Sequence, residues 1–277
     1  MYILAHTLLP ITSAPISKGV LHIEKGIIKQ IGSLELLRNI PASEIIDLSK
    51  QIITPGFVNT HAHLELTTLG SLSKKSGAFS DWIEQIIEKK SSLDEQQIIE
   101  GYKKGVALMM SSGVTTVLDN ISFNMPWEII PHFPLKIIPN AEVLGANIDV
   151  ALDIYAHIKE LREFFKTQHP DHTFFISAHS VHALHPKVLQ TLLTEIKTPQ
   201  FIHLAESEAE WDYFQTQSGG IAKLITKRGI EIPKIHQHSG LNVISKMGGE
   251  LSNITIIHGN YLSPSDLEIV VKNKTSV

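Results

Sequence analysis

The stretch that decides the fold is PGFVNTHAHLE, residues 55–65, in which an apolar run ends in two histidines one residue apart. Side chains alternate along a β-strand, so His61 and His63 project from the same face of it, one pleat apart. Two imidazoles at that spacing can bind one cation. A bare His-x-His is more often an exposed strand with two solvated histidines. Here the string follows a β-rich segment and precedes a strand–helix series, and that context favours a metal site.

The sequence on either side of this string predicts two parts. Before it lie short β-rich runs, with a hairpin turn at residues 24–26: Tyr2–Leu9, Gly19–Glu24, Ile27–Ile31 and Glu44–Leu48. From residue 55 onward, apolar runs alternate with amphipathic helical patterns. We expect strands at residues 56–63, 115–121, 135–144, 173–179, 200–204 and 253–258, and helices at 80–90, 94–111, 150–167, 186–196, 206–215 and 264–272. Asp94 and Ser263 are expected helix starts.

This alternation predicts an α/β protein with parallel βαβ units. We expect residues 1–54 to form a small β-sandwich portion, and residues 55–277 to form an incomplete TIM-type (β/α)8 barrel. Six strand–helix units are visible, whereas a closed barrel of this type needs eight. Residues 273–277 are typical of the run-in to a seventh strand. The chain is therefore expected to end before the last two units.

The composition narrows the class of protein. The chain has 277 residues, a formal net charge of −4 and scattered basic residues, so we expect neither nucleic acid nor membrane as a partner. No apolar run approaches the length of a membrane span and no signal peptide is evident, so a cytoplasmic location is the default expectation. Cysteine is absent, which excludes thiolate metal sites and the cysteine-ligated cytidine-type deaminases.

Three more strings place histidine near an expected strand end. They are SAHSVHALHP at residues 177–186, FIHLAESEAE at 201–210 and IIHGNYL at 256–262. A metal ion lowers the pKa of a bound water toward neutrality, and a neighbouring carboxylate can move the released proton. The less specific interpretation is that Glu206, Glu208 and Glu210 begin a helix, where acids suit the positive end of the dipole. We take that interpretation for Glu208 and Glu210.

The string at residues 55–65, with the β-rich prelude at residues 18–32, resembles the amidohydrolase superfamily and its deaminase and chlorohydrolase branch. The resemblance extends over essentially the whole chain. It implies that His61, His63 and His203 bind one divalent metal, with zinc expected and iron or manganese left open. It also implies that Glu206 is the proton shuttle. No lysine ends the fourth expected strand, which argues against a lysine-bridged two-metal centre.

The remaining site residues also follow from the resemblance. His258 is expected to hydrogen-bond the attacking water or the developing oxyanion, although a satisfied core histidine is the alternative. His179 aligns with a substrate-contacting histidine, and His182 is a second substrate-binding candidate. Relatives often carry His-Ala-Pro-Tyr here, so Val181 and His182 depart from the pattern. His185 is expected at a helix entry. The pair at residues 236 and 238 is taken as surface or pocket rim.

The resemblance predicts hydrolytic deamination of an amino-purine nucleoside, by attack of a metal-bound hydroxide at the carbon that bears the amine. FSDWI at residues 79–83, with Trp211, is similar to the aminodeoxyfutalosine deaminases of an alternative menaquinone route. The alternatives are a triazine or pyrimidine chlorohydrolase, a cyclic amidohydrolase, or an inactive truncated product. The eighth-strand aspartate of single-metal members is absent, and Asp119 is taken as structural. We expect a small-molecule substrate and leave a homodimer open.

Overall fold

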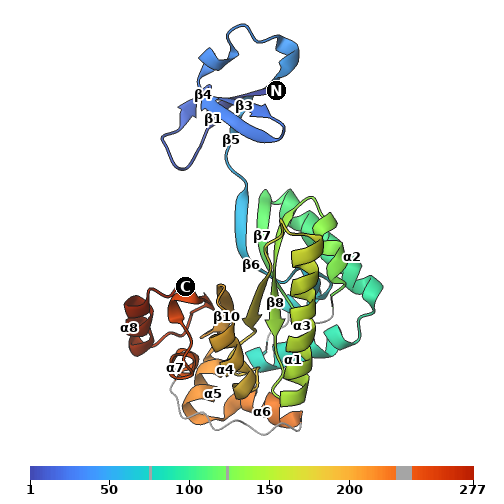
Figure 1. Cartoon of the computed structure of the whole chain (residues 1–277), viewed down its shortest axis with the longest axis vertical. Helices are drawn as coiled ribbons and strands as arrows, with labels where there is room; N and C mark the ends of the chain where they lie inside the picture. Colours follow the sequence, from blue (N-terminus) through green and yellow to red (C-terminus); the bar gives the residue numbers. More distant parts are fainter. Residues whose placement is uncertain (75–76, 123–124, 229–238) are drawn as a thin grey trace. The chain divides into compact units, whose positions relative to one another are not determined.

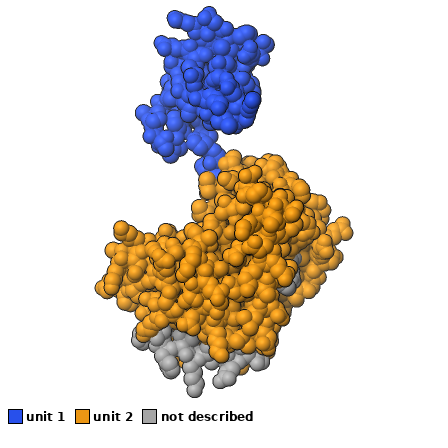
Figure 2. All heavy atoms as spheres, viewed as in Figure 1, with its two compact units in different colours: residues 1–57 blue, residues 58–277 orange. Residues whose placement is uncertain are grey.

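The computed structural model describes residues 1–74, 77–122, 125–228 and 239–277. The chain divides into two compact units, residues 1–57 and residues 58–277 (Figure 2). The sequence places the division after residue 54, and in the structure it falls within strand β6 (Phe57–Ala62). The histidines at residues 236 and 238 lie outside the described residues.

The first unit is built on one five-stranded sheet. Its strands are β1 (Tyr2–Leu8), β2 (Ile16–Ser17), β3 (Val20–Glu24), β4 (Ile27–Gly32) and β5 (Ile45–Ile53). The order is β2-β1-β3-β4, with β5 parallel to β1. The predicted hairpin turn joins β3 to β4 through Lys25 and Gly26, which both have positive φ, as a tight hairpin turn requires. One sheet holds every strand of residues 1–57, so the predicted sandwich is not confirmed.

The second unit contains the predicted parallel sheet (Figure 1). Its strands are β6, β7 (Val114–Ile121), β8 (Lys136–Val143), β9 (Phe175–Ala178), β10 (Gln200–Leu204) and β11 (Ile254–His258). The order β6-β7-β8-β9 forms one sheet and β10-β11 a second, and a parallel bridge from Ser180 to His203 connects the two. Parallel pairing runs through β7, β8 and β9 and again between β10 and β11, so the carboxyl ends of paired strands lie together.

Helices follow the strands of this unit. They are α1 (Phe79–Ser91), α2 (Glu95–Ser111), α3 (Ile148–Gln168), α4 (Pro186–Glu195), α5 (Glu208–Thr216), α6 (Gly219–Lys227), α7 (Gly240–Lys246) and α8 (Pro264–Asn273). The predicted helix starts are confirmed, because Asp94 and Ser263 each form a capping box with the residue three positions later. His185 caps α4 as predicted. Helices α6 and α7 were not predicted.

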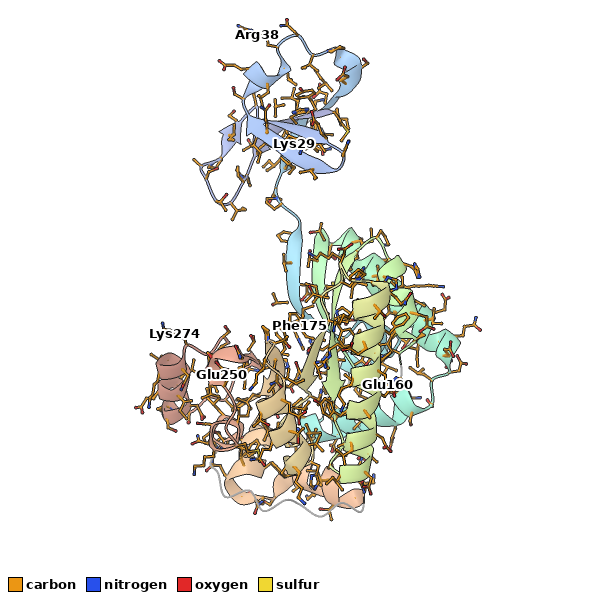
Figure 3. The ribbon with its side chains drawn as sticks, in the orientation of Figure 1. Lys29, Arg38, Glu160, Phe175, Glu250 and Lys274 are labelled. Atoms are coloured by element: carbon orange, nitrogen blue, oxygen red, sulfur yellow. The ribbon has the colours of Figure 1, made fainter. Side chains whose placement is uncertain are left out.

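The core of this unit lies between the strands and the helices that follow them. Ile137 of β8 and Ile158 and Phe165 of α3 are buried, whereas Glu160 of α3 is exposed (Figure 3). This is the amphipathic pattern expected for a helix that covers a sheet. Ser276 pairs with Thr255 of β11 in parallel, as the run-in to a further strand would. Among the described residues, every helix is too short or too polar to cross a membrane.

Candidate active site

His61 and His63 lie at the carboxyl end of β6, and the neighbouring backbone is fixed by side chains. Asn59 Oδ1 accepts a hydrogen bond from the His61 backbone N–H at 3.0 Å. Asp119 Oδ1, fully buried at the end of β7, accepts one from the Leu64 backbone N–H at 2.9 Å. The two imidazole rings meet edge to face, with centroids 5.0 Å apart. Local hydrogen bonds therefore hold both histidines in place.

His203, the last residue but one of β10, lies against both of these rings. Its ring centroid is 4.9 Å from that of His61 and 5.2 Å from that of His63. The Nε2 atoms of His63 and His203 are 3.1 Å apart. His203 is only 5% exposed. Three imidazoles that are distant in sequence therefore converge, as the sequence predicts.

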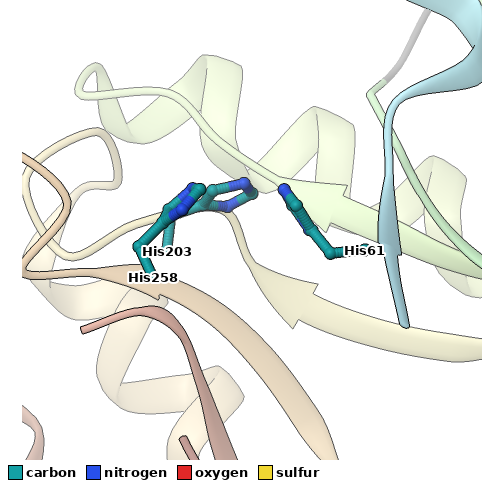
Figure 4. A group of neighbouring side chains, drawn as sticks. All are labelled: His61, His203 and His258. Carbon is teal, nitrogen blue, oxygen red and sulfur yellow. The ribbon is translucent and has the colours of Figure 1, made fainter. Parts of the chain in front are cut away.

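His258 brings a fourth ring from β11. Its centroid is 5.3 Å from that of His61 and 5.4 Å from that of His203, and the three rings point toward one common space (Figure 4). The backbone of His258 has φ of 79°, a left-handed conformation that a residue with a side chain adopts at a cost. Gly259, also at positive φ, donates its N–H to Leu204 O at 3.0 Å and ties this turn to β10.

The donor atoms fit a transition-metal ion. Two sets of possible ligand atoms lie within 4.8 Å of one another, His61 with His203 and His258, and His63 with Glu142 and His203. Of the three predicted ligands, His61 belongs to the first set, His63 to the second and His203 to both. Tetrahedral zinc with bonds of about 2.0–2.1 Å to nitrogen would separate two ligand nitrogens by about 3.3–3.4 Å. The 3.1 Å between the Nε2 atoms of His63 and His203 is close to that spacing.

The protonation state of these rings also suits a metal. Burial, followed by repulsion from His63 and His258, lowers the pKa of His61 to about 4. Burial, followed by repulsion from His179, lowers the pKa of His203 to about 2. Both rings are therefore neutral near pH 7 and keep a lone pair for a cation.

Glu206 follows β10 and faces His258. Its Oε1 is 3.5 Å from His258 Nε2, and both side chains are about a quarter exposed, at 26% and 28%. Burial raises the pKa of Glu206, and the facing His258 opposes the shift. A carboxyl with a raised pKa beside an imidazole can both accept and return a proton near neutrality.

Glu210 lies in the first turn of α5, as predicted, but it also has contacts that the helix-dipole interpretation does not include. Glu210 is 2% exposed, and its two carboxylate oxygens accept hydrogen bonds from the backbone N–H groups of Ala205, at 3.0 Å, and Glu206, at 2.8 Å. Ala205 has φ of 52°, so the turn that carries Glu206 is a left-handed one. Asn260 Nδ2 donates to Glu206 O at 3.1 Å from the opposite side. Glu210 therefore shapes the loop of the candidate proton shuttle.

The two predicted substrate contacts, His179 and His182, lie in different surroundings. His179 follows β9, with its ring centroid 4.6 Å from that of His203. Burial opposes protonation of His179, but Glu142 outweighs it and raises the pKa of this ring. His182 instead lies near Ser180 Oγ, at 3.4 Å, and Tyr213, at 6.1 Å between ring centroids. His182 Nδ1 is buried without a hydrogen bond.

The structure adds a row of buried polar groups that sequence reasoning missed. Asn120 Nδ2 lies 2.7 Å from His61 Nδ1, Asn140 donates to Asn120 at 2.6 Å, and Ser177 donates to Asn140 at 2.6 Å. All three are fully buried. Glu142, also missed, is fully buried beside His179 and His203. The available signal was a polar residue at alternate positions of an apolar strand, as at 140 and 142.

A model of the amidohydrolase family matches residues 52–277. The chain belongs to the amidohydrolase family. Among curated relatives of this amidohydrolase, a 5-methylthioadenosine/S-adenosylhomocysteine deaminase of Pyrococcus furiosus is 23% identical over 92% of the chain and 57% of the relative. An aminodeoxyfutalosine deaminase of Nitratiruptor sp. is 23% identical over 71% of the chain and 49% of the relative. The chain thus spans 49–57% of these relatives' length.

Solved structures share the fold of this amidohydrolase. Helicobacter pylori aminofutalosine deaminase, in complex with methylthio-coformycin, matches 98% of the chain and 67% of its own chain, with a TM-score of 0.77 and 16% identity. An adenosine deaminase of Xanthomonas campestris with bound zinc matches 99% of the chain and 61% of its own, with a TM-score of 0.75 and 16% identity.

Proposed function

We propose that this amidohydrolase is a metal-dependent hydrolytic deaminase that acts on an adenosine-like nucleoside. The observation that carries the proposal is the convergence of His61, His63 and His203 beside the facing pair Glu206 and His258. The named deaminases among its relatives support a purine-type substrate. We further propose that β6 to β11 are six strands of a (β/α)8 barrel, because the TM-scores to complete deaminases are high.

The roles of the residues follow from their chemistry. His61, His63 and His203 would hold the ion, and a divalent ion, zinc in the first instance, supplies a water whose pKa is near neutrality. Glu206 would take one proton from the attacking water and pass it to the ring nitrogen, and then carry the second proton of that water to the departing amine, which leaves as ammonia. His258 is proposed to hydrogen-bond the attacking oxygen, and the 3.5 Å between its Nε2 and Glu206 Oε1 supports this role. His179 is proposed to contact the substrate, with His182 as a second contact.

Metal binding and deamination can be tested separately on the 277-residue chain. Zinc content and affinity are measured first, by elemental analysis and chelator competition. We expect one zinc per chain, its loss in His203→Ala, and its retention in His6→Ala, which removes an exposed histidine of the other unit. Absence of stoichiometric zinc binding in the unmodified chain would contradict the proposal.

Turnover is then followed as ammonia release from a panel of substrates. The panel contains 5′-methylthioadenosine, S-adenosylhomocysteine, aminodeoxyfutalosine and adenosine. Chloride release from atrazine is measured separately and tests the chlorohydrolase alternative. We expect Glu206→Gln to keep zinc and to lose at least about 100-fold in rate, the scale of general acid–base catalysis. A Glu206→Gln variant with unchanged turnover on an accepted substrate would remove the assigned proton shuttle.

A further inference from the structure

Glu142 lies where it can act on two of the site histidines at once. It is on β8, fully buried, and Oε2 is 2.9 Å from His179 Nδ1 in a hydrogen bond. Its other oxygen, Oε1, is 3.3 Å from His203 Nδ1 and has no hydrogen bond of its own. A buried carboxylate oxygen without a donor is costly, and the His203 Nδ1 group is the neighbour that can supply one.

The hydrogen-bond chemistry of a carboxylate restricts both rings to one tautomer. An ionised carboxylate only accepts, so His179 Nδ1 carries a proton. His203 Nδ1 has two acceptors around it, Glu142 Oε1 and the His179 backbone oxygen at 3.1 Å, so it carries a proton as well. In the neutral rings the opposite nitrogens, Nε2, are then bare. For His203 this is the nitrogen that lies 3.1 Å from His63 Nε2.

We propose that Glu142 is a positioning residue that holds the Nδ1–H of His203 and of His179 on its own side, so that the Nε2 lone pair of His203 stays available for the metal and the Nε2 edge of His179 faces the substrate. The inference rests on the proposed function for the roles of these two histidines. The rival assignment is that Glu142 itself binds the ion, since its carboxylate groups with His63 and His203. Against it, both Glu142 oxygens face Nδ1 atoms, on the side of the rings away from the bare Nε2.

The variant that separates the two assignments is Glu142→Gln. Glutamine has one oxygen that accepts and one NH2 group that only donates. It can accept a hydrogen bond from one histidine Nδ1–H, but its NH2 group then faces the Nδ1–H of the other histidine, where two donors repel. We expect Glu142→Gln to bind one zinc per chain about 10- to 100-fold more weakly, the scale for loss of an outer-shell partner. With Co²⁺ in place of zinc, the visible absorption spectrum should keep its band positions and intensity, because the ligands are unchanged.

Asp266→Asn is the matched control. Asp266 is also fully buried and hydrogen-bonded, but it caps α8 and contacts serine and asparagine side chains. Its zinc affinity should equal that of the unmodified chain. Unchanged zinc affinity in Glu142→Gln would overturn the proposal. A cobalt spectrum that reports a lost ligand would overturn it in favour of direct binding.

A second measurement needs neither the Glu142 variant nor a metal. In the metal-free chain with ¹⁵N-labelled histidine, long-range ¹H–¹⁵N correlation distinguishes the Nδ1–H and Nε2–H tautomers, and His203→Ala and His179→Ala assign the signals. We expect Nδ1–H at both positions, and an Nε2–H form of His203 would refute the proposal. Failure of the unmodified chain to bind zinc would count against the proposed function. It would leave the tautomer result standing, because the tautomers are measured in the metal-free chain.

Discussion

Replacement of Glu210 by glutamine should change how the stability of the chain depends on pH. Glu210 is 2% exposed, and burial raises its pKa from 4.5 to about 7, although hydrogen bonds from the Glu206 and Ala205 backbone oppose the shift. Between pH 4.5 and 7 the folded chain therefore holds a proton at Glu210 that the unfolded chain releases. Stability from this group is complete below pH 4.5 and is lost as the pH rises through 7.

The size of the effect follows from the shift. One pKa unit corresponds to about 1.4 kcal/mol, so a move from 4.5 to about 7 corresponds to about 3 kcal/mol of stability that Glu210 loses across this window. Glutamine does not titrate and keeps one acceptor for the two backbone N–H groups. The loss of the other acceptor costs about 1–3 kcal/mol. Glu210→Gln should thus be less stable than the unmodified chain at pH 5, and the difference should shrink or reverse at pH 8.

The assay is urea unfolding at a series of pH values from 5 to 8, with the difference between variant and unmodified chain as the result. Both proteins contain the same residues 1–57 and the same other titrating groups, so the contributions of these to the free energy of unfolding cancel in the difference. Glu208→Gln is the control, because Glu208 lies in the same first turn of α5 but is exposed. A stability difference for Glu210→Gln that stays constant over this pH range would refute the reasoning.

Three other perturbations have defined outcomes. Tyr102→Phe removes the phenol that donates to Asp119 Oδ2 at 2.7 Å and should destabilise the chain by about 1–3 kcal/mol in urea unfolding. Asn120→Asp replaces the amide nitrogen beside His61 Nδ1 with an acceptor, which favours the His61 tautomer with a bare Nε2, so zinc affinity by chelator competition should rise. Free zinc at 100 times its Kd should stabilise the chain by about 2.7 kcal/mol in thermal unfolding, and His203→Ala should abolish this shift.

The secondary structure was largely predictable because its signals are local. The six strands of the second unit and the starts at Asp94 and Ser263 depend on hydrophobic period and on capping side chains a few residues apart. Helices α6 and α7 escaped prediction because they begin with glycine, at Gly219 and Gly240, where the sequence alone indicates loops. Tertiary contacts hold these segments helical despite the weak propensity of glycine.

The site was predictable as far as its histidines are concerned, because His61, His63, His203 and His258 each end an apolar strand. Their spacing and the family resemblance indicate which of the 15 histidines matter. The helix start at Glu210 was predictable but its loop contacts were not, because nothing in the sequence shows that the preceding loop folds back over this carboxylate.

Glu142 could have been anticipated by a stricter argument about buried acids. It lies between Ala141 and Val143 in a predicted parallel strand, and because such strands are covered on both faces, a buried location follows. A buried carboxylate must find donors. Because paired parallel strands bring their carboxyl ends together, the candidate donors are the groups that end the adjacent strands, and β9 and β10 end near His179 and His203. A buried acid in β8 therefore points to the histidines that end the adjacent strands.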